Sequence, residues 1–202
     1  MPSTPGPRRL QAEERRELIL DAALQVFSDK GFAGASMRDI ARAAGVTEGL
    51  LYHYFEGREQ LLQACCRERS WQAHLDRLLA EAAGVPLDEM LRRIVTEFLN
   101  TLYAHGPVAR MLAAEMQRNP ELTAQHMAQI EASHQTLVDF LRHRQSAGEI
   151  RADADPDLAA GLLMGSAYSV FLLWGTLPPA EWADLVEHMA RAVDVVMRGV
   201  AP

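Results

Sequence analysis

The chain has 202 residues, of which 49% are hydrophobic and 23% are charged. This is the composition of an ordinary globular protein whose core is large enough to need no disulfide or metal. The formal net charge of −7 excludes a strongly basic nucleic-acid-binding protein. Because the first 60 residues hold 8 basic and 9 acidic side chains, a nucleic-acid partner must be inferred from a motif and not from charge.

The N-terminus and the cysteines set the expected compartment. The first ten residues, MPSTPGPRRL, lack the apolar stretch of a signal peptide, and we expect a disordered arm over residues 1–12. Cys65 and Cys66 are neighbours, and adjacent helical residues point about 100° apart, which is poor disulfide geometry. No Cys/His spacing suits a metal. We therefore expect a cytoplasmic protein without a metal or cofactor.

A long amphipathic helix is expected first. Apolar residues recur at three- and four-residue steps between residues 13 and 30, which is the period of a helix with one buried face. Gly31 follows Lys30, and a glycine after a basic last turn is a typical helix end.

Two short helices are expected next. Ser36 can cap the first of them, and Asp39 three residues later resembles the second member of a capping box with a shorter acid. This helix ends at Gly45. Thr47 can cap a second short helix that runs to about Phe55.

The rest of the chain also has the helical period and no alternating strand pattern. Glycines and prolines separate further helices at about 58–83, 87–104, 108–117, 120–146, 155–175 and 179–198. The predicted fold is all-α, with about nine helices. We expect a three-helix domain over residues 13–60 and a larger helical domain over 61–202.

The most informative segment is residues 36–61, SMRDIARAAGVTEGLLYHYFEGREQL. A helix-turn-helix needs a small residue where its helices cross, a glycine in the turn and apolar residues that join the second helix to the first. Those requirements are met, in order, by Ala41, Gly45, Val46 and Leu51. The second helix of such a motif lies in the major groove of DNA.

With the preceding LILDAALQVFSDKGF, this segment closely resembles the signature of the TetR family of transcriptional regulators, over about residues 13–62. The matching positions are Thr47, Leu51, Tyr52, His53, Phe55 and Arg58. The resemblance implies a homodimer that grips double-stranded operator DNA through its N-terminal domains. It also implies a C-terminal ligand-binding and dimerisation domain, and release of the DNA when a small effector binds to that domain. Most regulators of this family repress transcription.

The resemblance also assigns roles to residues. Thr47, Tyr52 and Arg58 match positions that usually hold DNA phosphates, which set register without reading sequence. Arg38 is a further phosphate candidate, and His53 can touch a phosphate or a base edge. Arg58 stands where the family usually has lysine, which keeps the charge.

Two positions lie where the family approaches bases. Glu48 can accept a hydrogen bond from cytosine N4, or it can simply complement the dipole of its helix. Gly49 lies beside it. Leu50 replaces a residue that is commonly polar, so it meets a thymine methyl group or nothing.

The segment Leu158–Leu177 holds no charged residue over twenty positions. It is long enough to span a bilayer, but its flanks are acidic and lack the Lys or Arg of a membrane interface. We therefore expect no membrane, and a helix that faces its own core on one side and a second subunit on the other, with Gly161 and Gly165 permitting close approach. The resemblance assigns dimer packing to the last two helices, including Trp182, Val186, Met189, Val193 and Val196.

The effector prediction depends on large, adaptable side chains in the C-terminal region. A hydrophobic or aromatic effector is expected against Trp71, Phe98, Tyr103, Met111, Met116, Met164 and Tyr168, with Met127 and Trp174 as further candidates. His105, His134 and Glu115 are possible polar contacts. Ordinary core packing is the alternative for each of these residues.

The sequence also bears on two other classes of protein. A di-iron enzyme needs two Glu-x-x-His motifs, and Glu131–His134 is one without a second, so no enzyme is expected. A helical ligand-binding or interaction protein without DNA binding is the other alternative, favoured by the near-neutral N-terminal domain and by Leu50.

Overall fold

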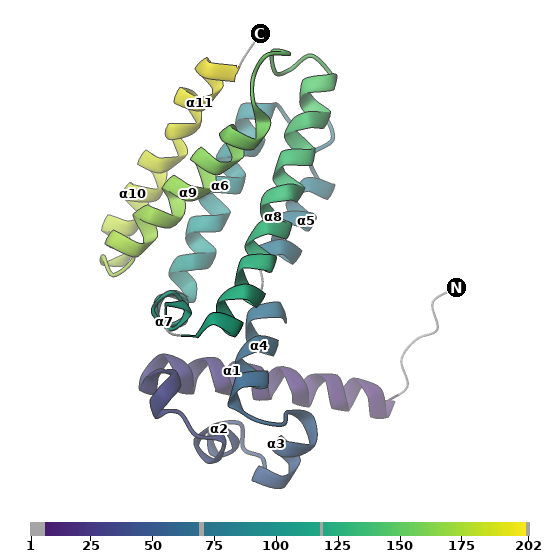
Figure 1. Cartoon of the computed structure of the whole chain (residues 1–202), viewed down its shortest axis with the longest axis vertical. Helices are drawn as coiled ribbons and strands as arrows, with labels where there is room; N and C mark the ends of the chain where they lie inside the picture. The colour runs from purple at the N-terminus through teal and green to yellow at the C-terminus, as the bar shows by residue number, and fades with distance from the viewer. Residues whose placement is uncertain (1–6, 69–70, 118, 201–202) are drawn as a thin grey trace. The chain divides into compact units, whose positions relative to one another are not determined.

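The structure is a computed structural model that describes residues 7–68, 71–117 and 119–200. These residues form helices and no strands, which confirms the all-α prediction (Figure 1). The helices are α1 (Pro7–Gly34), α2 (Met37–Ala43), α3 (Glu48–Tyr54), α4 (Arg58–Glu68), α5 (Trp71–Ala80), α6 (Leu87–Ala104), α7 (Gly106–Met116), α8 (Pro120–Ser146), α9 (Pro156–Trp174), α10 (Pro179–Ala190) and α11 (Ala192–Val200).

The nine predicted helices account for all of these segments. The predicted helix at 58–83 is described as α4 and α5 on either side of residues 69 and 70. The predicted helix at 179–198 is divided into α10 and α11 at Arg191, which caps α10. The break predicted at Gly31 is also present, as a kink within α1 where this glycine has φ 69°.

The start of α1 corrects the predicted arm. The helix begins at Pro7, so residues 7–12 are helical, and residues 1–6 lie outside the described residues. Proline is favoured at the first position of a helix because its φ is already helical and its missing N–H is not needed there. The Arg, Leu, Gln, Ala and Glu residues that follow are strong helix formers.

The described residues divide into two compact units, one within 1–69 and 110–123, the other within 70–109 and 124–202. The first unit has its own core, in which α1, α2, α3 and α4 bury Phe27, Ile40, Leu51 and Leu61. Cys65 at the end of this core is fully buried as well. The predicted domain boundary between residues 60 and 61 stays a prediction. The apolar face of α4, which follows that boundary, packs in the first core.

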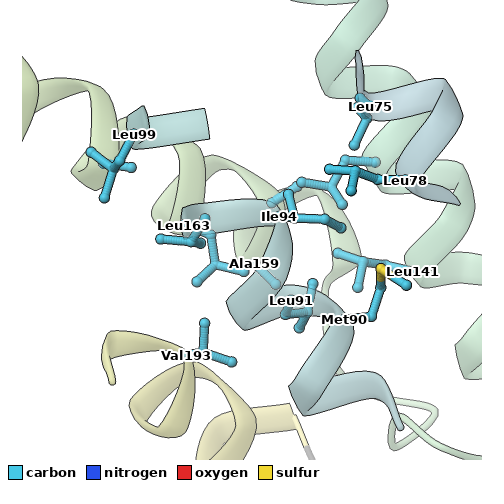
Figure 2. Packing of buried hydrophobic residues seen from close by; sticks show 14 of the residues in the cluster. Leu75, Leu78, Met90, Leu91, Ile94, Leu99, Leu141, Ala159, Leu163 and Val193 are labelled. Carbon is cyan, nitrogen blue, oxygen red and sulfur yellow. The ribbon is translucent and has the colours of Figure 1, made fainter. Parts of the chain in front are cut away.

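The second unit is built around α6, which packs against α5, α9, α10 and α11. Figure 2 shows Met90, Leu91 and Ile94 of α6 among side chains of its neighbours, including Leu141 of α8 and Leu163 of α9. Each fully buried side chain of this size stabilises the folded state by about 1.5–3 kcal/mol. Helix α6 is therefore the central element of this core.

Part of the predicted dimer packing is wrong. Trp182, Val186 and Val193 are 3%, 6% and 0% exposed within their own subunit, because the inner faces of α10 and α11 pack on α6. Met189 and Val196 are partly buried against the same cluster. The first three side chains are not accessible to a second subunit.

Helix α9 has two different faces. Ala159, Ala160, Leu163, Ala167 and Phe171 lie in the core, and the opposite face remains exposed. Within the described residues, α9 is the one helix long and apolar enough to cross a membrane, with a mean hydropathy of 1.4. Length and composition alone are weak evidence for a span, because a core helix of a soluble protein has both.

Candidate nucleic-acid interface

Helix α2 begins as the sequence predicts. The Ser36 hydroxyl accepts a hydrogen bond from the Asp39 amide at 3.1 Å and donates one to the Asp39 carboxylate at 2.6 Å. The same carboxylate lies 2.7 Å from Lys30 Nζ. Lys30 and then Ser36 lower the pKa of Asp39 from 3.8 to about 2. The cap of α2 is thus tied to the end of the straight part of α1.

The turn between α2 and α3 requires a glycine. Gly45 has φ 65°, a conformation that side chains with a Cβ rarely adopt. The amide of Val46 donates to the Ala41 carbonyl at 3.0 Å, and the amide of Gly45 donates to the Arg42 carbonyl at 3.2 Å. This pair of hydrogen bonds is a Schellman motif, which satisfies the last carbonyls of α2 and turns the chain toward α3.

Helix α3 is capped and anchored on one side. The Thr47 hydroxyl accepts a hydrogen bond from the Leu50 amide at 3.2 Å. Leu51 is fully buried and Phe55, which caps the C-terminus, is 3% exposed. The Arg16 guanidinium lies 5.2 Å from the centre of the Phe55 ring, a cation–π contact that brings α1 against the end of α3.

The opposite side of α3 is open to solvent. Glu48, Gly49, Tyr52 and His53 are exposed, and Tyr52 keeps 52% of its surface accessible. The exposed Thr47 precedes them. The helix therefore has a buried anchor and an outward polar and aromatic face, which is the form that a recognition helix requires.

Arg38 extends this face onto α2. Its Nε lies 3.7 Å from Glu48 Oε1, and the two side chains are 74% and 51% exposed. A pair this exposed contributes little to stability. Breaking this ion pair therefore costs little free energy, and both side chains can contact DNA instead.

Arg58, the remaining predicted DNA contact, is used inside the protein. Its Nη1 donates to the backbone carbonyls of Phe32, Ala33 and Ala35, each at 3.2 Å. Its guanidinium also lies 4.8 Å from the centre of the Phe32 ring. Sequence reasoning missed these partners. The available signal was a cation at the start of a helix, where its charge is unfavourable.

The predicted effector residues divide between the two cores. Met111 and Met116 pack against the core that contains α1–α4. The other predicted residues pack against the α6-centred core, namely Trp71, Phe98, Tyr103, Met164 and Tyr168.

Aromatic contacts bring some members of the second set together. Trp71 and Phe98 meet edge to face at 5.1 Å, and Trp71 stacks on His74 at 5.2 Å. Tyr103 stacks on Trp182 at 4.8 Å and donates its hydroxyl to the Leu177 carbonyl at 2.8 Å. Tyr103 therefore already has structural partners.

Gln72 and His74, which follow Trp71 in α5, are polar residues that sequence reasoning missed. Gln72 Oε1 and His74 Nε2 are buried atoms without a hydrogen-bond partner, although His74 Nε2 lies 3.4 Å from a Glu97 carboxylate oxygen and is paired when protonated. By contrast, His134, a predicted polar contact, already has a partner, because its Nε2 lies 3.0 Å from Asp157 Oδ1. Burial raises the pKa of the Tyr168 hydroxyl above its ordinary value.

Cysteine and metal chemistry is not prominent in the described part of the chain. Cys65 Sγ donates a hydrogen bond to the Leu20 carbonyl at 3.7 Å, and burial raises the pKa of the Cys66 thiol to about 11, which keeps Cys66 protonated and unreactive at neutral pH. No group of three or more His, Cys, Asp or Glu side chains among the described residues could hold a metal ion.

Comparison with known proteins places this motif in a family. A family model described as bacterial regulatory proteins, tetR family, matches residues 19–65, and one described as tetracyclin repressor-like, C-terminal domain, matches residues 85–193. The chain is 28% identical over 182 residues to the HTH-type transcriptional regulator UidR of Escherichia coli K12, covering 90% of this chain and 89% of UidR. It is 28% identical over 160 residues to the HTH-type transcriptional repressor KstR2 of Mycolicibacterium smegmatis, covering 78% and 76%.

Among solved structures, Salmonella enterica GusR superposes with a TM-score of 0.75 at 28% identity, covering 92% of this chain and 94% of GusR. The C-terminal model alone matches more than half of the chain. The chain therefore belongs to the TetR family of bacterial regulatory proteins.

It follows that the protein is a DNA-binding transcriptional regulator with a ligand-binding C-terminal domain, and not an enzyme. Regulators of this family bind operator DNA and small-molecule effectors.

Proposed function

We propose that the protein is a cytoplasmic homodimeric repressor that binds a palindromic operator and is released by a small hydrophobic or aromatic effector. The observation that carries the DNA-binding part is the two-sided geometry of α3. Leu51 and Phe55 are buried behind it, while Tyr52 and His53 stand outward. Repression is favoured by the similarity to KstR2, whose name describes a repressor.

The outward residues divide into two groups in this proposal. Arg38, Thr47 and Tyr52 hold phosphates and set the register of the helix in the groove. Glu48 and Gly49 approach base edges, and His53 takes either role. Glu48 leaves Arg38 as DNA approaches, because a phosphate competes for the same guanidinium.

The outer face of α9 supports the homodimer. Leu158, Leu162 and Leu173 are 59%, 56% and 68% exposed, and exposed apolar patches of this kind mark interaction surfaces. A Cβ added to Gly165 would meet nothing within 4 Å. The subunit's own packing therefore does not require this glycine, and a second copy of α9 can approach closely there.

Dimerisation is also a geometric requirement of the proposed function. A palindromic operator presents two half-sites about 34–36 Å apart, and a two-fold protein matches them with two recognition helices. An effector that binds better to a conformation with wrongly spaced helices weakens operator binding by its difference in affinity for the two conformations.

The effector is proposed to lie near Trp71 and Phe98, with Met164 and Tyr168 as further apolar contacts. Gln72 supports a polar contact beside Trp71, since its Oε1 is a buried atom without a hydrogen-bond partner, whereas His74 Nε2 already lies 3.4 Å from a Glu97 carboxylate oxygen. An apolar ligand with one hydrogen-bonding group fits this combination.

The test is operator binding. Duplexes tiled across the DNA upstream of the gene would be titrated with the protein, and fluorescence anisotropy would be measured. We expect saturable binding to one duplex with a palindrome, and loss of binding on addition of an effector found by thermal-shift screening. A folded protein that binds none of these duplexes better than random DNA would instead support a helical ligand-binding protein without DNA binding.

A further inference from the structure

The environment of Arg58 is unusual for a residue at the start of a helix. It is the first residue of α4, where the positive end of the helix dipole disfavours a cation. Its only acidic neighbour in sequence, Glu59, lies 3.4 Å from its Nε. The arginine nevertheless keeps just 35% of its side chain exposed, so a compensating interaction must lie on its buried side.

That interaction is with the opposite end of another helix. Phe32 and Ala33 lie beyond the kink at Gly31, among the last residues of α1, and Ala35 follows them; backbone carbonyls at a helix end lack helical partners and carry partial negative charge. Arg58 Nη1 donates to all three carbonyls at 3.2 Å. The flat guanidinium also covers the Phe32 ring at 4.8 Å, which a lysine ammonium cannot do in the same way.

The contact joins two positions on either side of the helix-turn-helix. Ala35 and Arg58 are separated by 23 residues, and α2, the turn and α3 all lie between them. The contact therefore closes the base of the helix-turn-helix, joining the point where the chain enters the motif to the point where it leaves.

We propose that Arg58 is a positioning residue that holds the helix-turn-helix in its DNA-binding orientation and makes no phosphate contact itself. This inference rests on the proposed operator binding, but its structural part can be tested without DNA. Three carbonyls hold Nη1 and the Phe32 ring lies against the guanidinium, so moving this side chain outward to a phosphate would break the contacts that close the motif.

The salt dependence of operator affinity separates the two roles. Each phosphate contact adds about 0.9 to the slope of log affinity against log salt concentration. We expect Arg58→Ala to weaken operator binding about tenfold with the wild-type slope, and to speed amide hydrogen exchange in residues 36–55. The matched control, Arg38→Ala, removes an exposed arginine and should lower the slope with little effect on exchange.

A slope for Arg58→Ala that is lower by about 0.9, with unchanged exchange in residues 36–55, would overturn the proposal. Unchanged operator affinity together with unchanged hydrogen exchange would also overturn it. A lower melting temperature with normal operator affinity in the folded protein would do the same, because a residue that only stabilises the fold would give this result.

A second variant covers the case in which Arg58→Ala does not fold. Phe32→Leu keeps an apolar side chain in the core but removes the ring under the guanidinium. We expect weaker operator binding with the wild-type slope, and wild-type affinity for this variant would count against the proposal. If the wild-type protein binds no operator, the proposed function fails, while faster exchange in residues 36–55 of the variants would still support the closing role of Arg58.

Discussion

Helices α3 and α9 are both buried on one side and open on the other, but their open sides differ in chemistry. The outward face of α3 carries Glu48, Tyr52 and His53, whereas that of α9 carries Leu158, Leu162 and Leu173. Polar and aromatic groups on a short, capped helix suit the edges of DNA, and leucines on a long helix suit a second protein surface. The buried residues of each helix thus determine its orientation, and the exposed ones determine its partner.

The largest effect is expected from a charge on the α9 face. Leu162→Glu places a carboxylate where the second subunit is proposed to pack, and burying an unpaired charge is very unfavourable. We expect the dimer to dissociate, measured by analytical ultracentrifugation, and operator affinity to fall by about a hundredfold or more. Leu18→Glu changes an equally exposed leucine on α1 (60% against 56%) and should leave the dimer intact. A dimeric Leu162→Glu protein would contradict the proposed interface.

The next effect concerns the α3 face. Tyr52→Ala removes an exposed side chain, so the melting temperature should stay close to that of the wild type while operator affinity falls about tenfold. Tyr52→Phe isolates the hydroxyl, and the same loss in this variant would identify the hydroxyl as the phosphate donor. Normal operator binding by Tyr52→Ala would show that α3 does not meet DNA through this face.

A smaller effect, on stability, is expected from an alanine at Gly45 in the turn between α2 and α3. Gly45→Ala forces a Cβ into a backbone with φ 65°, and we expect a loss of unfolding free energy of about 1 kcal/mol. Gly49→Ala is the matched control, because it lies within α3, with nothing within 4 Å of the added Cβ, and alanine favours helix. Urea denaturation should therefore show a lower free energy of unfolding for Gly45→Ala and a higher one for Gly49→Ala. A change of the same sign in both variants would refute this account of the turn.

The smallest expected effect is the pH dependence of the α2 cap. Lys30 and Ser36 lower the pKa of Asp39 from 3.8 to about 2, so the carboxylate stabilises the folded state fully above about pH 4 and loses this effect as the pH falls toward 2. Asp39→Asn should slightly lower the melting temperature at pH 7 and should have a much smaller effect near pH 2, where the Asp39 carboxylate is largely protonated in the unfolded state and partly protonated in the folded state. A difference that persists unchanged at pH 2 would show that the charge of Asp39 is not involved.

Several local features could be predicted from the sequence because they depend on neighbouring residues. The Ser36 and Thr47 caps, the break at Gly31 and the glycine turn at Gly45 each use hydrogen bonds or backbone angles within a few residues. The outward position of Tyr52 follows in the same way from the buried Leu51 beside it. Such patterns are local, so they are visible in the chain itself.

Predictions that depended on distant residues were less successful. The sequence places Trp182 and Val193 in a dimer interface, but they lie in the subunit's own core, because α10 and α11 turn that face to α6. The effector set divided between two cores, since an apolar side chain does not reveal by its type which cluster it will join. A helical pattern identifies an apolar face but not the helix that covers it.

The sequence by itself determined an all-helical chain with a helix-turn-helix in the order and spacing of its family, because helix periods, caps and turns arise from contacts between near neighbours. Only the tertiary structure decided that Arg58 meets the end of α1, and that the free face of α9 is its leucine side. Both outcomes depend on groups brought together from distant parts of the chain, and their positions follow from how whole helices pack.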